Sequence, residues 1–291
     1  MIMPRLALGT VQFGLDYGVS NKRGRIPADE AFAILDEAGH EHGRVLDTAA
    51  AYGTSEDVLG EYLGRRETGF KVVSKYAAER SVPGGLLQQL ERTLERLAQK
   101  DIYGYLLHSF SDLEKVPGVW EEMIRVRETG LAQKIGFSLY SPEELESLFQ
   151  KGILFDIVQV PHSVFDRRFA PFFGRLKDKG VEIHTRSVFL QGLAFMGPKG
   201  LSGVLQGAGP ALGSLAAVAR AERMTVQELC LRFSASEPLI DEVVVGVDGL
   251  KAWQENVRCF SSGPLSKGIV ASLGAAAIND EEILLPFRWG K

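Results

Sequence analysis

The chain is poor in cysteine, and only Cys230 and Cys259 occur among its 291 residues. Their spacing is not that of metal ligands. Cys230 lies in an apolar pattern of helical period, which is typical of a reduced structural thiol. We therefore expect no metal site, and we expect a protein of the reducing cytoplasm.

Long apolar runs are also missing, and no stretch reaches the roughly 18 residues that a transmembrane helix requires. The N-terminal segment has a short apolar run without a basic start, so it does not indicate a signal peptide. The formal net charge of -4 gives no reason to expect nucleic acid or an acidic membrane surface as a partner. A small molecule is the expected partner, and the oligomeric state stays open.

The prevailing pattern is an alternation of short apolar runs with longer segments of helical period. Eight runs occur, at 6–8, 45–47, 71–75, 102–107, 134–138, 157–160, 181–186 and 242–247. Apolar strands separated by helices are typical of a parallel sheet covered on its outer face. With no linker to divide the chain, this predicts one (β/α)8 TIM barrel, a parallel eight-stranded barrel with outer helices, over residues 1–291. A doubly wound sheet is the alternative, but the G-x-G-x-x-G motif is missing after the first run.

Helical patterns fill the intervals between these runs. We expect helices at 28–40, 56–63, 84–97, 119–129, 142–150, 169–176, 212–223, 226–236 and 250–260. Pro27 and Pro83 stand at two helix starts, and Ser55 and Ser141 are the expected caps of two others. The glycine-rich stretch 197–213 is expected to be a mobile loop on the face where barrel active sites are built.

Four polar residues stand at the carboxyl ends of successive runs or just beyond them, namely Asp47, Tyr52, Lys75 and His108. In a barrel these ends meet at one mouth, so residues far apart in sequence come together. Each residue alone has a plainer interpretation, as a turn cap, a loop aromatic, a surface lysine or a core histidine. Their coincidence at matching strand ends favours a catalytic site.

The motifs around these residues resemble those of the aldo-keto reductase family. They are LGTVQFG at 8–14, DTAAAYGTSEDVLGEYL at 47–63, VVSKY at 72–76, LLHS at 106–109, IGFSLYS at 135–141 and QGL at 191–193. The resemblance runs in order from residue 6 to about residue 260 and does not extend to the last thirty residues. It implies a nicotinamide-dependent oxidoreductase that interconverts a carbonyl and an alcohol, with Asp47, Tyr52, Lys75 and His108 as its catalytic residues.

The chemistry explains why these side-chain types are needed. Hydride addition to a carbonyl carbon leaves an alkoxide, and Tyr52 is the acid expected to protonate it. A free phenol has a pKa of about 10, and Lys75 as a close cation would lower that pKa. Asp47 would hold Lys75 charged, while His108 would donate a hydrogen bond to the substrate oxygen.

The resemblance also implies a dinucleotide site, with NADP as the expected cofactor and NAD as the alternative. Ser138 and Gln159 would hold the nicotinamide carboxamide, and Leu139 stands where the family usually has an asparagine. Arg186 takes the place of the tyrosine that often stacks on the nicotinamide, and its guanidinium is planar enough to do so. An ion pair with a nearby acid is the other interpretation of Arg186. Further contacts on this side are expected from Gly9, Thr10, Ser187, Phe189 and Gly192.

The adenosine end of this site is the least typical of the family. The places that often hold groups for a 2′-phosphate are taken by Gly246, Val247 and Ala252. Asp248 adds a negative charge, and Lys251 is the only obvious cation of this stretch. The sequence therefore predicts weak discrimination between NADP and NAD. Cofactor contacts are expected from Gly246, Val247, Glu255 and Asn256.

Two other functions stay open at this point. One is a nucleotide-binding regulatory barrel that turns over little, and the other is a barrel lyase or isomerase that needs no cofactor. The complete set of four polar residues argues against the first. The substrate is not determined, since an aromatic wall would suit a sugar-like or an aromatic carbonyl equally; its expected members are Phe13, Tyr17, Tyr140, His162 and Phe189.

Overall fold

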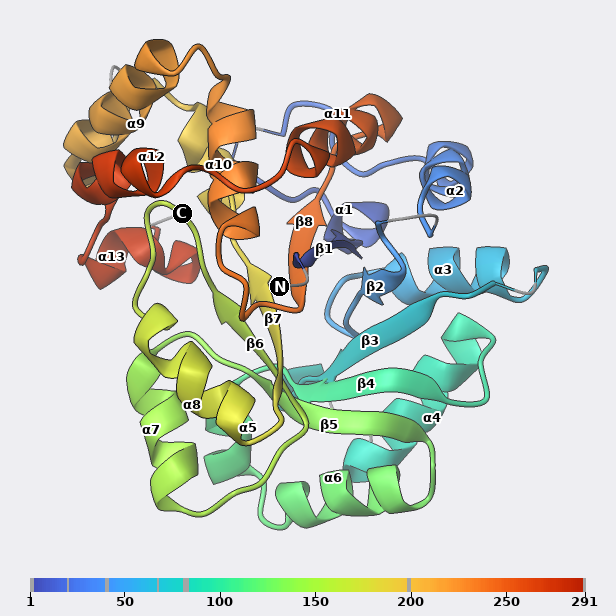
Figure 1. Ribbon diagram of the computed structural model, residues 1–291. Helices are drawn as coiled ribbons and strands as arrows, with labels where there is room; N and C mark the ends of the chain where they lie inside the picture. Colours follow the sequence, from blue (N-terminus) through green and yellow to red (C-terminus); the bar gives the residue numbers. More distant parts are fainter. Residues whose placement is uncertain are drawn as a thin grey trace.

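Eight parallel strands close into a barrel in the order of the sequence (Figure 1). This computed structural model describes residues 3–19, 21–39, 42–66, 68–80, 84–197 and 200–289. The strands are β1 (Arg5–Gly9), β2 (Val45–Asp47), β3 (Lys71–Tyr76), β4 (Ile102–Leu107), β5 (Ala132–Ser138), β6 (Ile157–Pro161), β7 (Glu182–Arg186) and β8 (Glu242–Gly246). The predicted (β/α)8 barrel is confirmed, and all eight predicted runs form strands with bounds shifted by two residues at most.

The barrel closes between the first and the last strand. Leu6 pairs with Val243, and Gly9 pairs with Gly246 at the carboxyl ends of β1 and β8. The strands are buried on both faces, which is why they are nearly continuous apolar runs rather than alternating ones. At Gly136 on β5, an added Cβ would lie 1.7 Å from the carbonyl oxygen of Ile157, so only glycine permits this close approach to β6.

The predicted helices form on the outside of the barrel. They are α2 (Ala28–Glu37), α3 (Ser55–Leu63), α4 (Gly85–Leu97), α6 (Val119–Glu128), α7 (Pro142–Gln150), α8 (Phe173–Asp178), α9 (Gly209–Ala221), α10 (Val226–Ala235) and α11 (Leu250–Ser261). A capping box formed by Ser141 and Glu144 begins α7, as its sequence predicts. The predicted helix end at His40 and the helix start at Pro83 lie outside the described residues.

Two local predictions are wrong. Ser55 is not the cap of α3, because the helix begins at Ser55 itself with Thr54 in the capping position. The Ser55 hydroxyl instead donates to the carbonyl oxygen of Thr10 at 2.9 Å, which ties α3 to the end of β1. The stretch 197–213 is not one irregular loop, since its described residues include η4 (Gly203–Ala208) and the start of α9. Pro210 at the start of α9 favours a helix there in spite of the glycines.

The end of the chain, where the family resemblance is lost, is helical. It forms α12 (Lys267–Ser272), η5 (Leu273–Ala276), α13 (Glu281–Leu284) and η6 (Pro286–Arg288), and Figure 1 shows α12 beside α9. An ion pair of 2.8 Å joins Glu281 to Arg168 after β6. The Phe287 ring meets the Tyr140 ring edge-on at 5.2 Å between centroids. The C-terminal segment is thereby held against the loops that follow β5 and β6.

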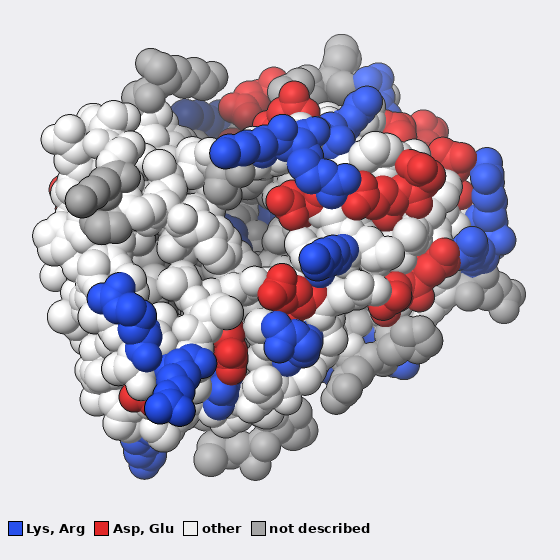
Figure 2. All heavy atoms as spheres, turned by 90° about the horizontal axis from the view of Figure 1, so that it is seen from above, with Lys and Arg blue, Asp and Glu red and all other residues white. Residues whose placement is uncertain are grey.

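Charge is unevenly distributed over the face seen in Figure 2. Acidic and basic side chains are dense on the right of the view, to one side of a central hollow, whereas the left side is mostly uncharged apart from a few Lys and Arg near its lower edge. Both cysteines are buried and unpaired, as expected for structural thiols. Over the described ranges, no group of histidine, cysteine and acidic side chains could hold a metal ion. Over the same ranges, no helix is both long and apolar enough to cross a membrane.

Candidate active site

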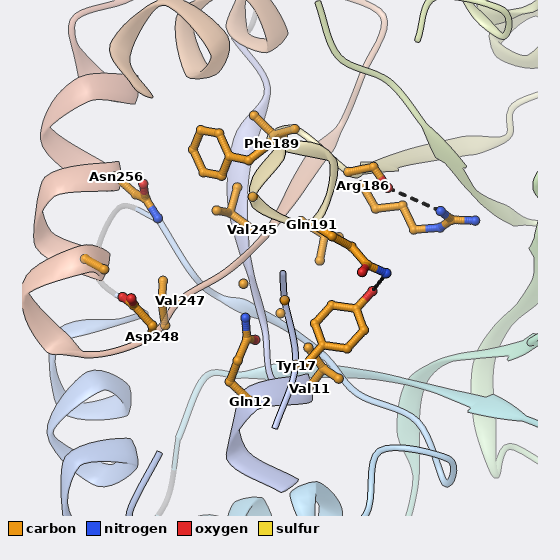
Figure 3. A pocket seen from close by; sticks show the side chains of 18 of the residues that line it. Val11, Gln12, Tyr17, Arg186, Phe189, Gln191, Val245, Val247, Asp248 and Asn256 are labelled. Atoms are coloured by element: carbon orange, nitrogen blue, oxygen red, sulfur yellow. Dashed lines mark hydrogen bonds between the residues drawn. The ribbon is translucent and has the colours of Figure 1, made fainter. Parts of the chain in front are cut away.

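The carboxyl ends of the strands surround a cavity of about 430 Å³. Figure 3 shows Asn256 and Asp248 at one end of the cavity, Arg186 at the other, and Gln12 and Tyr17 between them on the β1 side. Most residues predicted for the site line this cavity: Gly9, Thr10, Asp47, Tyr52, Gln159, Arg186, Ser187, Phe189, Gly192, Gly246, Val247, Glu255 and Asn256. Lys75, His108 and Ser138 are not among the lining residues.

Lys75 and Asp47 form a buried ion pair, of which Asp47 lines the cavity and Lys75 does not. The Lys75 ammonium lies 2.8 Å from each carboxylate oxygen of Asp47 and 2.9 Å from the carbonyl oxygen of Thr48. The Lys75 side chain is fully buried, and 5% of the Asp47 side chain is exposed. Gln159 on β6 donates to the same carboxylate at 2.7 Å, so the Asp47 carboxylate accepts from two strands.

Tyr52 lies in front of this pair. Its ring centroid is 5.1 Å from the Lys75 ammonium and 5.7 Å from the His108 ring, which meets it nearly edge-on. Tyr52 lines the cavity, so its phenol is placed between the buried pair and the open space. The three predicted partners Asp47, Lys75 and His108 thus come together around one tyrosine.

The pKa of Tyr52 differs from the sequence-based expectation. Burial raises the pKa of the Tyr52 phenol well above its ordinary value, and the Asp47 and Tyr140 charges act in the same direction. Arg186 is the cation that opposes this rise in pKa. The expected net lowering of this pKa is not found, because the effect of burial on the Tyr52 phenol is the largest.

His108 is a neutral imidazole in this environment. Burial lowers the pKa of His108 from its ordinary 6.5 to about 3, and the Lys75 and Arg186 charges add to this effect. A neutral imidazole carries one N–H donor and one acceptor nitrogen. His108 is therefore able to donate one hydrogen bond to an oxygen without transferring a full charge.

The predicted nicotinamide side is built by the ends of β5, β6 and β7. Ser138 is buried and pairs in register with Gln159. The Leu139 side chain is fully buried, and its carbonyl oxygen accepts a hydrogen bond of 2.8 Å from Arg186. The Arg186 guanidinium also packs on the Tyr140 ring at 4.2 Å. Neither contact involves an acid, so the ion pair considered for Arg186 is not formed with any described residue.

Gln12 is a lining residue that the sequence analysis did not single out. Its side-chain oxygen is buried and has no hydrogen-bond partner among the described residues. An added Cβ at Gly246 would lie 2.8 Å from this oxygen, so glycine at the end of β8 leaves room for the Gln12 amide. The signal was present in the LGTVQFG motif, whose glutamine lies three residues after the end of β1.

The α11 end of the cavity is acidic. Asp248 and Glu255 both line it, while Lys251 does not. Near Asp248 lies a cation that sequence reasoning missed, since Arg23 donates to the Asp248 carbonyl oxygen at 2.6 Å. Arg23 is already paired with Glu30 at 2.8 Å, and Glu30 also accepts from the backbone N–H of Leu250 at the start of α11. The first N–H group of α11 is therefore already bound to a carboxylate of the chain.

A strained segment follows β7. Ser187, Leu190 and Gln191 have positive φ angles of 67°, 46° and 53°, and Gly192 follows with 93°. The side-chain amide of Gln191 donates to the Tyr17 hydroxyl at 2.7 Å (Figure 3). The backbone carbonyl oxygen of Gln191 accepts from the backbone N–H of Val19 at 3.0 Å. These two bonds connect the loop after β7 with the loop after β1 across the cavity.

The predicted aromatic wall is only partly correct. Tyr17, Tyr140 and Phe189 line the cavity. Phe13 and His162 are 1% and 3% exposed and belong to the interior instead. His162 packs between the Phe233 and Phe173 rings, each 5.4 Å away between centroids. Because their neighbours in the sequence are apolar, the sequence could not distinguish an aromatic residue of the core from one that lines the cavity.

A family model described as the aldo/keto reductase family matches residues 5–278 of this chain. Among curated proteins, the NAD(P)H-dependent 6′-deoxychalcone synthase of Glycine max is 32% identical over 153 residues. That match covers 44% of this chain and 47% of the relative, so the chain spans about half the length of the curated relative it matches.

Solved structures show the same architecture. A holo-form aldo-keto reductase from Bacillus halodurans has a TM-score of 0.77 at 19% identity, with 96% of this chain and 95% of that chain covered. The glycerol dehydrogenase of Gluconobacter oxydans has a TM-score of 0.72 at 18% identity, with 93% and 90% covered. At these identities the likeness establishes the fold.

Proposed function

The chain belongs to the aldo/keto reductase family, and on that premise we propose that it is an NAD(P)(H)-dependent oxidoreductase that interconverts an aldehyde or ketone with an alcohol. The observation that carries this proposal is the cluster of Asp47, Lys75 and His108 around a tyrosine that faces the cavity. A tyrosine with a buried cation and a neutral imidazole behind it supplies a proton donor and a hydrogen-bond donor to one carbonyl oxygen.

The cavity fits a dinucleotide in its composition. The Gln12 side-chain oxygen is a buried acceptor that lacks a partner, as a site for a polar ligand requires. Asn256 accepts from Gln227 at 2.7 Å, which fixes its amide at the α11 end. In this proposal the carboxamide end lies near Gln159 and the adenosine end near Glu255 and Asn256. When bound, the reduced nicotinamide supplies the hydride.

The residues of the chain have distinct roles in this scheme. Tyr52 keeps its proton at neutral pH, because its pKa is raised, and gives that proton to the oxygen of the reduced carbonyl. His108, whose pKa is lowered to about 3, donates a neutral hydrogen bond to the same oxygen. The Asp47–Lys75 pair holds the end of the site rigid.

Electrostatics at the adenosine end bears on the choice between NADP and NAD. Asp248 and Glu255 would repel a 2′-phosphate, and Arg23, which contacts the Asp248 carbonyl oxygen, is paired with Glu30. A helix N-terminus attracts anions, but the Leu250 N–H is bound to Glu30. We propose that NADP and NAD are both accepted, with weak discrimination between them.

Titration of the purified protein with NADPH and NADH, followed by a panel of aldehydes, tests this function. Tyr52→Phe is expected to lose roughly 10²–10⁴-fold in turnover while dinucleotide binding is kept. Tyr105→Phe is a matched control, because it removes a buried hydroxyl that has no hydrogen-bond partner among the described residues. Turnover of Tyr52→Phe within about threefold of the parent would remove Tyr52 from this role.

Dinucleotide binding without turnover of any reactive aldehyde would favour the regulatory barrel. Absence of binding to either dinucleotide would favour a barrel enzyme that needs no cofactor.

A further inference from the structure

We propose that Arg186 forms an anion-binding subsite beside the reactive tyrosine, and that the carbonyl substrate carries a carboxylate that binds there. This inference rests on the proposed function and deepens it by naming the substrate class. It starts from the placement of one guanidinium in the cavity.

Arg186 is the cavity's cation. Among the described residues that line the cavity, it is the only lysine or arginine. Three acids also line the cavity, namely Asp47, Asp248 and Glu255. Asp47 is neutralised by Lys75, whereas Asp248 and Glu255 lie at the α11 end. Figure 3 shows Arg186 and Asp248 on opposite sides of the cavity. The end with the reactive tyrosine is therefore positive, and the far end is negative.

The Arg186 guanidinium is oriented but not neutralised. One nitrogen donates to the Leu139 carbonyl oxygen at 2.8 Å, and another lies 3.4 Å from the Ser187 hydroxyl. A guanidinium has five N–H donors, so these two contacts leave most of them unused. Its plane is also fixed against the Tyr140 ring at 4.2 Å. A fixed, charged fork with unused donors matches the two oxygens of a carboxylate.

The charge of Arg186 shifts the pKa values of several residues in the reactive cluster. It lowers the pKa of His108, and it opposes the rise in the pKa of both Tyr52 and Tyr17. These effects place the guanidinium near the tyrosine that faces the carbonyl. A carboxylate bound to Arg186 would therefore lie only a few bonds from the reacting carbon. The Tyr17 hydroxyl accepts from Gln191, which leaves its own hydrogen for an acceptor in the cavity.

Arg167 is a second arginine with similar packing, and the comparison shows that packing alone does not identify Arg186 as the anion-binding residue. Arg167 donates to the Leu273 carbonyl oxygen at 2.7 Å and lies over the Phe233 ring at 4.7 Å. It makes the same two kinds of contact as Arg186, and no ion pair of Arg167 is found among the described residues. Arg167 does not line the cavity. Among the described arginines and lysines, Arg186 alone lines the cavity, and Arg167 is its matched control.

The test compares 4-oxobutanoate with its methyl ester, which differ in the charge of one end. The parent is expected to favour 4-oxobutanoate by roughly 10- to 100-fold in kcat/KM, the range of a hydrogen-bonded charge pair. In Arg186→Met this ratio is expected to fall to near one, whatever the absolute rates. Arg186→Lys keeps the charge without the fork and is expected to give an intermediate ratio. Arg167→Met is expected to keep the parent ratio.

Several outcomes overturn the inference. A parent ratio near one, or a ratio that survives in Arg186→Met, shows that the guanidinium does not bind the carboxylate. If the ratio survives while dinucleotide dissociation constants rise, Arg186 serves the cofactor instead. If Arg186→Met does not fold by circular dichroism, the ratio in Arg186→Lys decides. Failure of the proposed function is distinct, since then neither aldehyde is reduced with either dinucleotide.

Discussion

Removing the charge of Asp47 tests how much the buried Asp47–Lys75 ion pair contributes to the stability of the fold. Asp47→Asn keeps the shape of the side chain but takes away the only counter-charge within 2.8 Å of the Lys75 ammonium. Lys75 is fully buried, so water cannot replace the lost carboxylate. The Thr48 carbonyl oxygen at 2.9 Å remains as an acceptor, but it is neutral. The variant is left with a buried and uncompensated ammonium.

The magnitude follows from the burial of both partners. Breaking a buried pair by removing one side costs about 3–5 kcal/mol, against a total stability of roughly 5–15 kcal/mol for a folded domain. Burial already lowers the pKa of Lys75, and Asp47 is the main influence that raises it. Without Asp47 that pKa falls further, and Lys75 escapes the penalty by losing its proton. The loss of stability is therefore greatest below the lowered pKa of Lys75 and shrinks as pH rises from that pKa toward the ordinary value of about 10.4 in the unfolded chain.

Urea unfolding of Asp47→Asn, Lys75→Met and the double variant measures this effect at pH 6 and pH 9. The double variant removes both charges, so we expect it to be at least about 2 kcal/mol more stable than the sum of the two single losses predicts. A loss below about 1 kcal/mol for Asp47→Asn, or strictly additive losses, would refute the buried-pair argument.

Three further predictions concern other parts of the molecule. Asp248 is exposed, and Asp248→Ser is expected to shift cofactor preference toward NADPH severalfold. The reason is that an exposed contact between like charges is worth about 1 kcal/mol. A parent protein that already prefers NADPH by more than about a hundredfold in dissociation constants would contradict this. Burial lowers the pKa of His162 from its ordinary 6.5 to about 4, so the folded state loses up to about 3 kcal/mol as pH falls through that window. His162→Phe should flatten this part of the stability profile, and an unchanged slope in urea unfolding would count against it. Gly136→Ala should prevent barrel closure, because its Cβ would lie 1.7 Å from the Ile157 carbonyl oxygen; normal soluble expression with an unchanged melting temperature would disprove this.

Much of the fold was open to prediction, because strands buried on both faces leave short apolar runs that differ from helical patterns in period. The strand ends then placed Asp47, Lys75 and His108 near one another. Ser55 shows the limit of this reasoning, since its side chain serves a contact 45 residues away instead of a local cap. Cap statistics describe neighbours in sequence and carry no information about Thr10.

The electrostatics of the site were less predictable for the same reason. Sequence predicted that Asp47 would hold Lys75, and the pair forms, but it did not show that burial would raise the pKa of Tyr52. Arg23 is more than 200 residues from Asp248, and its contact there depends on the closed barrel. The C-terminal segment had no recognisable pattern, yet Phe287 reaches the Tyr140 ring at the mouth of the site.

Barrel closure between β1 and β8 has a consequence for synthesis of the chain. Arg5 pairs with Glu242, so one edge of β1 lacks its partner until β8 has left the ribosome. At about 5–20 residues per second, that edge waits roughly 10–50 s. An unpaired strand edge is a template for pairing with other chains, and parallel closure over such a distance is slow. The nascent chain therefore keeps one edge of β1 open to pairing with other chains until β8 emerges.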